Sequence, residues 1–470
     1  MIEARRRQLR FGEGLIAEEV ADLQEDWMKH ADQVLEDEAL VAEVYEALAH
    51  RHPKSRTRGR RGTPAEVVLR LFLLKHIRNW SYGVLEREVR ANLVYRNFTR
   101  VGADKVPDAK TMGRLGLALG PDGIEKIHQR VVEIAKEKEV VKGRKMRLDT
   151  TVVETNIHYP TDSSLLGDGV RVLIRAMKRI AEIAGAQGAK LRDRSRSVKR
   201  RILEIGRVAR TKGGPNRERL QQGYKKLVSA VGRVVGQAKR FSSEIAQGVK
   251  QSTDVMQQAA LQGLRKELDT FVPRVQQVIR QAKQRIFGGD THVAEKLASL
   301  FEPATEIIRK GKASKPTEFG KMVKIQEGEN QIITDYAVYE KRPSDSELVI
   351  PALDSHEKRF GCTPRLVAGD AAFYSAKNEA AAHERGVKRV CIPNRSTKSA
   401  ERKREQKKRW FKEGQRWRTG CEGRISVLKR RHGLRRCLYK GTTGMQRWVG
   451  LGVIADNLHH LGTVLAKRKN

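Results

Sequence analysis

A long stretch of helical periodicity interrupts a strand pattern in the middle of this chain, and it restricts the possible folds more than any other feature. Apolar residues step alternately by four and three over residues 220–245 and again over 261–282. This spacing is the seam of long helices packed side by side. Gly248 and Asp254 bracket the expected reversal, and Pro273 predicts a kink or a break in the second helix. The pattern predicts an antiparallel helical insertion within a core that contains strands.

The strand before the insertion contains an aspartate. Residues 144–157 read RKMRLDTTVVETNI, in which Met146 and Leu148 face one side of a strand and lead to Asp149. Strands are poor in Asp. Asp149 therefore either marks a turn at a strand end or has a chemical role, and this segment alone leaves both interpretations open.

After the insertion, strand and helix patterns alternate. Strands are expected over residues 317–326, 331–340, 366–368 and 387–392. The first two form a hairpin, and the third ends at Asp370. Helices are expected over about residues 347–359, from Ser375 to near Gly386, and over about 416–431.

The first 140 residues predict helices only. An acidic, solvated helical segment and a basic linker occupy residues 1–62. The helix-start signals after it are a capping box at Thr63, Pro64 and Glu66, caps at Ser81 and Asp108, and Pro121 at the start of a fourth helix. These short helices form a compact domain over residues 63–140. It either binds DNA as a helix-turn-helix does or is a plain structural bundle.

The charge balance points to a polyanionic partner. The 470 residues include 95 Lys and Arg against 56 Asp and Glu, a net charge of +39, while 39% hydrophobic residues still allow a core. Nucleic acid is the simplest such partner. No apolar run is long enough to span a bilayer and no secretory signal is evident. Four cysteines without a CxxC pair argue against structural zinc or disulfides, so a reduced, cytoplasmic, nucleoid-associated protein is expected.

The last predicted helix supplies a third acidic residue. At 100° per residue, Arg418, Glu422 and Lys429 share one face, beside an apolar stripe that includes Trp417. Taken alone, this is an ordinary amphipathic helix with a charged flank. Its place in the order of elements gives it more weight.

The element order is that of an α/β RNase H-like catalytic core, a mixed sheet flanked by helices, once the insertion is left out. Parallel strands joined by crossover helices bring their carboxyl ends to one crevice, so Asp149, Asp370 and Glu422 are expected to meet there. Three carboxylates in one place repel one another unless a cation neutralises them. Hard oxygen ligands select Mg²⁺ or Mn²⁺, and two such ions can activate a water or a 3′-hydroxyl.

Three segments resemble a known family, the bacterial insertion-sequence DDE transposases, of the ISNCY type or a close relative. The segments are LDTTVVETNIHYPTDS, LVAGDAAFYSAKN and RWRTGCEGRISVLKRRHGL, and the resemblance spans about residues 60–460. The wider group carries the motif Y-x2-R-x3-E-x6-K. Arg418, Glu422 and Lys429 match its spacing, while Gln415 stands at the Tyr position. Any role of that Tyr is therefore not carried over.

The resemblance implies both a reaction and a set of roles. Asp149, Asp370 and Glu422 would be the catalytic residues and the ligands of two Mg²⁺ ions, for which Mn²⁺ may substitute, with Asp149 bridging both. Arg418 and Lys429 would hold phosphates of the transposon end. The protein would bind terminal inverted repeats in double-stranded DNA, cleave at the element ends and join the 3′-hydroxyl to target DNA. A homodimer would hold both ends in a synaptic complex.

Other residues near these motifs have weaker signals. Trp410, Lys315 and Lys321 are candidate DNA contacts, and Thr150, His158 and Asp162 are possible near-site residues. For the two lysines a solvated charge is an equally good interpretation, and for His158 a loop-stabilising role is favoured. Trp410 is a better candidate for base stacking than Trp417, whose position on the apolar stripe predicts core packing.

The expected domains follow from these patterns. After residues 1–62 and 63–140 come the first part of the core at 141–162, an all-helical insertion at 163–310, the rest of the core with the Glu422 helix at 311–460, and a basic tail at 461–470. Three alternatives to a transposase remain open at this point. They are an RNase H-like nuclease without strand transfer, a non-catalytic, domesticated DNA-binding protein, and an RNA-binding scaffold.

Overall fold

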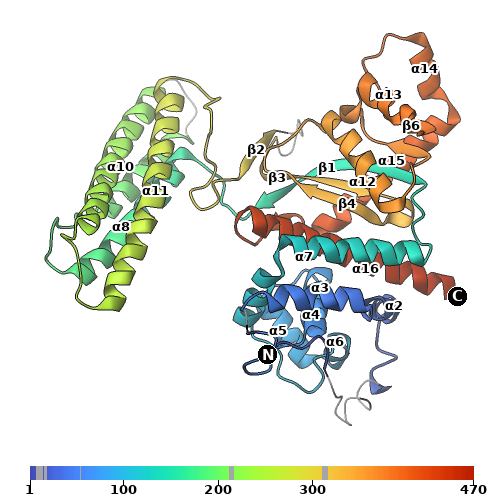
Figure 1. Cartoon of the computed structure of the whole chain (residues 1–470). Coiled ribbons are helices and arrows are strands. Elements are labelled where there is room, and N and C mark those ends of the chain that lie inside the picture. The colour runs from blue at the N-terminus through green and yellow to red at the C-terminus, as the bar shows by residue number, and fades with distance from the viewer. Residues whose placement is uncertain (7–13, 15–17, 53, 211–215, 310–315, 470) are drawn as a thin grey trace. The chain divides into compact units, whose positions relative to one another are not determined.

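The structure, a computed structural model, divides the chain into two compact units (Figure 1). It describes residues 1–6, 14, 18–52, 54–210, 216–309 and 316–469. The first unit combines Met1–Asn156 with Ile308–Asn470, and the second is Ile157–Ile307. No helix among the described residues has both the length and the apolar character needed to cross a lipid bilayer.

The N-terminal part of the first unit is helical. Its helices are α2 (Asp26–Leu35), α3 (Glu38–Ala49), α4 (Ala65–Ile77), α5 (Tyr82–Ala91), α6 (Leu93–Phe98) and α7 (Ala109–Glu137). Ser81 and Asp108 cap α5 and α7 by accepting backbone N–H bonds, which confirms both predicted caps. The backbone leaves the helical conformation at Gly120 inside α7, so a new helical run begins at Pro121 as predicted.

Two predictions for this region are wrong. Helix α4 begins at Ala65 with Pro64 at its N-cap and no side-chain cap, so the capping box at Thr63 does not form. Glu66 instead binds the buried guanidinium of Arg70, with 3.1 Å between Oε1 and Nε. The acidic N-terminal segment is not merely solvated, because the apolar sides of α2 and α3 are buried in the same core as α4 and α7. Some of its acidic residues also have partners in the fold, since Asp32 binds the buried Arg70 and Asp37 binds Arg130.

The remaining part of the first unit contains a mixed sheet. The strands are β1 (Lys145–Thr155), β2 (Glu306–Arg309), β3 (Thr317–Glu327), β4 (Ile333–Val338), β5 (Leu366–Ala368), β6 (Arg389–Cys391) and β7 (Arg436–Cys437). The main order is β2-β3-β1-β5-β6, with β4 beside β3 and β7 beside β1. β1 runs antiparallel to β3 and parallel to β5, and β5 is parallel to β6. This arrangement is compatible with an RNase H-like core, and the predicted hairpin is present as β3 and β4.

Helices cover both faces of this sheet (Figure 1). They are α12 (Val349–Phe360), α13 (Ala376–Glu384), α14 (Ala400–Lys407), α15 (Arg409–Arg431) and α16 (Gly441–Lys469), with short 3-10 turns η1 (Glu329–Gln331), η2 (Asp345–Leu348) and η3 (Ala371–Phe373). Met146, Leu148 and Val152 of β1 pack with α12 and α13. Val153, on the other face, packs with α15 and α16. Alternate residues of β1 therefore face two different helical layers.

The second unit is an all-helical bundle. Its helices are α8 (Asp162–Ala184), α9 (Ser195–Val208), α10 (Asn216–Ala246) and α11 (Val255–Phe287). The predicted seams are buried between them, and Asp254 caps α11 after the reversal. Of the kink or break predicted at Pro273, the break does not occur, because α11 continues through the proline. Val272 and Val275 are buried in the core on either side, and this packing holds the helix together despite the missing backbone N–H.

A buried lysine joins the N-terminal helices to the end of the first unit. Lys75 of α4 is 3% exposed, and its Nζ lies 5.1, 5.5 and 4.5 Å from the ring centroids of Tyr82, Tyr439 and Trp448. No carboxylate among the described residues forms an ion pair with it. Burial lowers the pKa of Lys75 to about 7, while the aromatic faces favour the charged ammonium.

We expect this lysine to make stability depend on pH. The unfolded lysine keeps its proton up to a pKa near 10.5, whereas the folded one releases it near 7, so the unfolded state binds more protons between these values. From pH 7 to about 9 the free energy of unfolding of the wild type should rise by about 2 kcal/mol relative to Lys75→Met. Urea unfolding at each pH measures this difference. Lys29→Met, at an exposed position of α2, is the control and should run parallel to the wild type.

Parallel stability curves for the wild type and Lys75→Met would contradict the expectation. They would indicate that the three rings keep the ammonium charged over the whole pH range.

Candidate active site

Asp149 lies in the middle of β1 and faces α15. It is on the same side of the strand as Arg147 and Val153, and its side chain is 15% exposed. Its Oδ1 accepts the backbone N–H of Thr150 at 2.7 Å. The aspartate is therefore part of a paired strand and does not mark a turn, since it stands opposite Ile325 of β3.

Asp370 follows the neighbouring parallel strand. β1 and β5 are in register with Arg147 opposite Ala368, so Asp149 and Asp370 each come two residues after a paired position. Ala368 packs with Phe411 of α15, the helix that Asp149 faces. Because side chains alternate along a strand, the residues of β5 that share the orientation of Ala368 lie on the same side of the sheet as Asp149. Asp370 ends its strand by capping η3, where its Oδ1 accepts the N–H of Ala372 at 2.9 Å. Neighbouring strands lie about 5 Å apart, so the two aspartates belong to one edge of the sheet.

Glu422 projects from α15, the helix that covers this face. Arg418, one turn earlier, donates from Nη2 to Glu422 Oε1 at 2.6 Å, and its Nη1 lies 3.8 Å from Asp149 Oδ2. The guanidinium thus stands between the two carboxylates and supplies the positive charge that they need. Arg418 is mostly buried, at 14% exposure, whereas the Glu422 side chain is 56% exposed. Glu422 can therefore move toward a ligand more readily than Arg418.

A buried ion pair fixes α15 to β1. Arg147 is 3% exposed and binds Glu327 of β3, which has no exposed surface, through two N–H groups. A third N–H of Arg147 donates to the backbone carbonyl of Trp417, and its guanidinium lies 4.8 Å from the Trp417 ring centroid. At Gly420 a Cβ would lie 2.5 Å from Arg147 Nη1, so the glycine leaves room for this contact. The segment Trp417–Gly420 that carries Arg418 is thereby held against the strand that carries Asp149.

Gln415 fixes the same helix at the ends of β5 and β6. Its Nε2 donates to the carbonyls of Cys391 at 2.5 Å and of Gly369, next to Asp370, at 3.2 Å. This is the position at which the family motif has a tyrosine. The amide therefore links α15 to the strand end that carries the second aspartate.

Burial controls the ionisation of the groups beneath the site. It raises the pKa of the Cys391 thiol to about 11 and that of Cys421 well above its usual range, so both thiols stay protonated at neutral pH. Burial also raises the pKa of Glu327, and the Arg147 guanidinium acts in the opposite direction. The layer below the three acids thus contains two neutral thiols and the buried pair Arg147 and Glu327, on which the charges of Arg424 and Asp456 also act.

The donor set of the site consists of carboxylates. Among the residues that the structure describes, no three His, Cys, Asp or Glu side chains stand close enough together to hold a metal ion as they are. Asp149 and Glu422 are linked through Arg418, and Asp370 lies at the same sheet edge. Carboxylate oxygens without His or Cys fit a hard cation such as Mg²⁺ or Mn²⁺. Binding through Glu422 requires its ion pair with Arg418 to open.

The other predicted site residues have varied surroundings. Lys429 is half-buried two turns after Glu422 on α15, and Trp410 is half-buried with Arg389 5.6 Å from its ring centroid. Lys321 is buried, and its ammonium donates to the carbonyl of Glu340. Lys315 lies outside the described residues.

Two near-site candidates belong to the second unit. His158 Nε2 lies 3.5 Å from Asp168, while Asp162 is buried and accepts bonds from Gln281 at 3.0 Å and Arg285 at 2.5 Å. Both carboxylate oxygens of Asp162 thus have partners inside the helical bundle, where the residue also starts α8.

Sequence reasoning missed four residues of the site. These are the buried pair Arg147 and Glu327, the clamp Gln415, and Asp345, whose Oδ1 accepts a hydrogen bond from Thr150 Oγ1 at 3.0 Å. Asp345 begins η2, which packs against η3 after Asp370. The only sequence signal for Asp345 was that an acidic residue stands just before the helical pattern of α12. Nothing in the sequence distinguishes Glu327 from the other polar residues around the predicted hairpin turn.

Two family models match separate parts of the chain. Residues 17–115 match the family described as Transposase domain (DUF772), which covers α2–α6 and the start of α7. Residues 377–462 match the family described as Transposase DDE domain, which includes Arg418, Glu422 and Lys429 but neither Asp149 nor Asp370. Comparison with curated proteins and with solved structures gives no match.

Proposed function

Because these two matches indicate that the chain is an insertion-sequence DDE transposase, we propose that it binds the terminal inverted repeats of its element, cleaves DNA at the element ends and joins the 3′-hydroxyl to target DNA. The catalytic part is an RNase H-like core, with Asp149, Asp370 and Glu422 as its three acids. The helices over residues 63–140 contribute to DNA binding, and two copies of the chain hold the two ends together.

One observation carries this proposal. Asp149 and Asp370 follow equivalent positions of two paired parallel strands, and the helix that bears Glu422 packs on the same face. The carboxyl edge of parallel strands is where ligands bind in α/β sheets. A position in the middle of a paired strand gives Asp149 no role as a turn residue, which leaves the chemical role as the better interpretation.

The carboxylate chemistry of the three acids suits a divalent cation, and Asp149, Asp370 and Glu422 would hold two Mg²⁺ ions once the Glu422 ion pair with Arg418 opens. When bound, the metal neutralises charge on the phosphate and lowers the pKa of the attacking hydroxyl. The protein's part is to hold the oxygen ligands on β1, on the β5 edge and on α15 at a fixed spacing. Arg147 and Gln415 maintain that spacing by fixing α15 to the strands.

Arg418 is well placed to receive the phosphate. Its Nε is buried and has no hydrogen-bond partner among the described residues, which leaves a donor for an oxygen beside the two N–H groups that now face carboxylates. A phosphate competes with Glu422 for the guanidinium, because both are oxygen anions suited to its fork. Lys429 on the same helix adds a second positive charge.

The reaction conserves the number of phosphodiester bonds once the ends are free. In cleavage, a water oxygen forms a new P–O bond, the bond to the 3′ oxygen breaks, and that oxygen leaves as a hydroxyl. In joining, this 3′-hydroxyl attacks a phosphodiester of target DNA and releases a new 3′-hydroxyl there. Neither step requires an external energy source.

The test is a cleavage and strand-transfer assay. Labelled duplexes of the DNA flanking the gene are incubated with the wild type in Mg²⁺, Mn²⁺ or EDTA, together with a target plasmid. A second duplex, pre-cut at the end and carrying a dideoxy terminus, lacks the 3′-hydroxyl. We expect metal-dependent nicking at the repeat end, and joining of the pre-cut duplex only when it carries the hydroxyl.

Each alternative gives a different product pattern. Nicking without joining of the pre-cut duplex indicates a nuclease. Repeat-specific binding that is equal in Mg²⁺ and EDTA, with no nick, indicates a non-catalytic DNA-binding protein. Either pattern would overturn the proposed reaction.

A further inference from the structure

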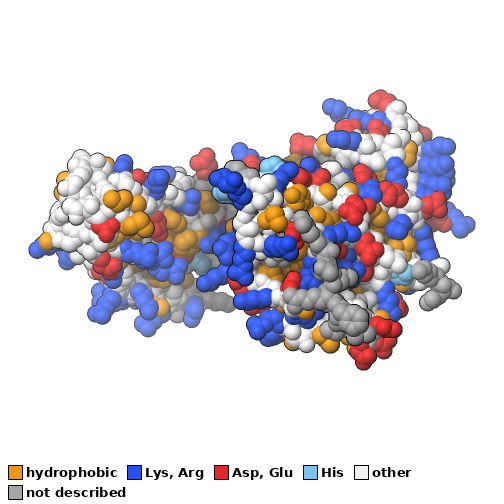
Figure 2. Space-filling model, turned by 60° about the horizontal axis from the view of Figure 1, so that its bottom comes forward, with side chains coloured by type: hydrophobic (Ala, Val, Ile, Leu, Met, Phe, Trp, Pro, Cys, Tyr) orange, Lys and Arg blue, Asp and Glu red, His pale blue; other side chains and the backbone are white. Residues whose placement is uncertain are grey.

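The second unit carries an excess of positive charge, most of it on exposed side chains. Residues 157–307 contain 29 Lys and Arg against 14 Asp and Glu, and residues 171–210 alone contain 13 against 3. Lysine and arginine side chains are scattered among uncharged ones over the face of the molecule in Figure 2. A few of these residues belong to the fold, since Lys250 is buried beside Glu244 and Arg285 binds Asp162. Most of the others are exposed and lie outside the apolar core. An accumulation of like charge lowers the stability of a compact bundle unless an anion binds.

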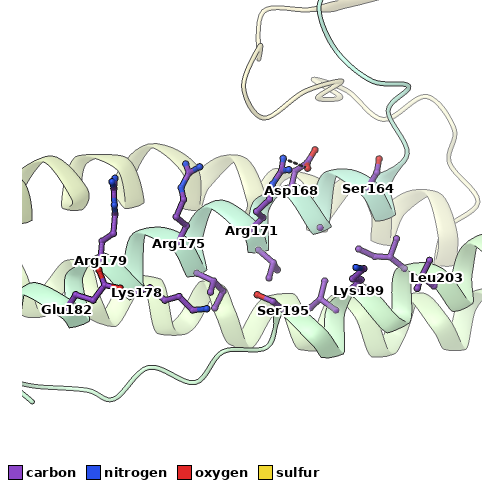
Figure 3. A pocket seen from close by; sticks show the side chains of 15 residues that line it. Ser164, Asp168, Arg171, Arg175, Lys178, Arg179, Glu182, Ser195, Lys199 and Leu203 are labelled. Atoms are coloured by element: carbon purple, nitrogen blue, oxygen red, sulfur yellow. Dashed lines mark hydrogen bonds and ion pairs between the residues drawn. The ribbon is translucent and has the colours of Figure 1, made fainter. Parts of the chain in front are cut away.

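One row of arginines lies along α8 beside a groove. Arg171, Arg175 and Arg179 are spaced by four residues, about 6 Å of helix rise, and point to the same side in Figure 3. All three are exposed, and the groove of about 850 Å³ lies between α8 and α9. Arg171 and Arg175 pair with Asp168 and Glu267, whereas Arg179 has no such partner among the described residues. The three guanidiniums are spaced evenly along a line, so they can contact successive charged groups of a linear polyanion.

A second group of arginines is located where α9 begins. Arg192 and Arg194 precede α9, and the charges of Arg192 and of Arg233 on α10 both act on Arg194. The loop that carries them is tied to α10, because Gln237 Nε2 donates to the Lys190 carbonyl at 2.9 Å. Arg233 lies one turn before Gln237 on α10. We call Arg192, Arg194 and Arg233 the arginine cluster.

The arginine cluster has no counter-charge of its own. No ion pair joins any of its members to a carboxylate in the described part of the chain. Asp193 stands between Arg192 and Arg194 in the chain. Its carboxylate binds Lys178 at 2.7 Å and accepts the backbone N–H of Ser195 at 2.8 Å. Partial burial and the charges of Arg192 and Arg233 together lower the pKa of Arg194. The loop that carries Arg192 and Arg194 is anchored on α10, so these guanidiniums and that of Arg233 form a positively charged surface suited to an oxygen anion.

We propose that the arginine cluster and the α8 row form a second DNA-binding surface, which contacts the phosphodiester backbone without reading bases. The ligand is a polyanion with regularly repeated charge, which suits the regular spacing of the arginines along α8. The proposal rests on the function proposed above only in naming DNA as that polyanion. The carboxylate site and this surface occupy different units of the chain.

The test measures DNA binding by the full chain in EDTA, where no cleavage interferes. The cluster variant carries Arg192→Gln, Arg194→Gln and Arg233→Gln. The charge-matched control carries Lys225→Gln, Lys266→Gln and Lys283→Gln, at exposed positions of α10 and α11. The probes are a labelled duplex of random sequence, about 40 base pairs long, and its single strand, titrated at several salt concentrations between about 50 and 200 mM.

We expect the cluster variant to lose three phosphate contacts. Its slope of log affinity against log salt on the duplex should be about 2.7 shallower, and its duplex affinity near 150 mM salt should fall on the order of 100-fold. The control should change by less than about threefold, with unchanged thermal melting of both variants. A similar loss on the single strand alone would identify displaced strands as the ligand, which is the same backbone from another source.

Two outcomes would overturn the proposal. One is equal loss of affinity in the cluster variant and the control, which would make the effect one of net charge. The other is unchanged duplex and single-strand binding with lost binding of a poly-glutamate peptide, which would assign the surface to an acidic protein. Because binding is measured without metal, these results stand whether or not the wild type cleaves DNA.

Discussion

Replacement of Asp149 by asparagine is expected to lower the rate of metal-dependent nicking at the element end by about 10³-fold, which corresponds to about 4 kcal/mol of transition-state stabilisation. Asparagine has the same shape and can still accept the N–H of Thr150, so β1 keeps its pairing with β3. The change removes the charge with which Asp149 would hold metal. Initial rates of nicking in Mg²⁺ on the flanking duplex measure the effect.

The matched control is Asp354→Asn. Asp354 is an exposed carboxylate on α12 that pairs with Arg385, and it lies outside the site. This variant changes the net charge by the same amount and should nick at the wild-type rate. Asp149→Asn should also bind the duplex in EDTA as tightly as the wild type, since the loss concerns catalysis. A nicking rate within tenfold of the wild type would show that Asp149 is not a metal ligand.

The second large effect is expected at Arg147, which acts through α15 as a positioning residue. Arg147→Met removes the partner of Glu327 and leaves a carboxylate with no exposed surface in the core. Breaking a buried pair in this way costs about 3–5 kcal/mol of folding free energy. Urea unfolding, monitored by a probe in the first unit, measures the loss of folding free energy. Nicking should fall as well, because the bond to the Trp417 carbonyl that fixes the segment bearing Arg418 is lost.

A double variant separates stability from positioning. Arg147→Met with Glu327→Leu removes both charges and should recover most of the stability, because an apolar pair of similar size often replaces a buried ion pair at little cost. It does not restore the anchor on Trp417. We expect its metal dependence to shift to higher Mg²⁺ concentrations, with nicking restored only partly. Full recovery of nicking at low Mg²⁺ would show that the pair serves stability alone.

Local patterns in the sequence determined the elements that carry the site. Period-two alternation identified the strand of Asp149 and the hairpin, and the four-three spacing identified the long helices of the insertion. The 100° spacing placed Arg418 and Glu422 on one face, and the structure pairs them. These features depend only on the geometry of single helices and strands, which side-chain order in the chain expresses directly. The helix ends were less certain. At the start of α4 the N–H groups of Ala65 and Glu66 bind the carbonyls of Glu3 and Ala4 in place of a side-chain cap, and at Pro273 core packing overrode the breaking signal.

Only the tertiary structure decided what surrounds those elements. Arg147 alternates with apolar residues like a solvent-facing charge, yet β1 is covered on both faces, so it is buried against Glu327, 180 residues away. Gln415 looked like a departure from a motif and is a clamp between a helix and two strand ends. Lys321 looked like a candidate DNA contact and is buried. Burial and pairing across such distances depend on which faces the sheet and its helices bring together, and no local pattern in a single sequence contains that information.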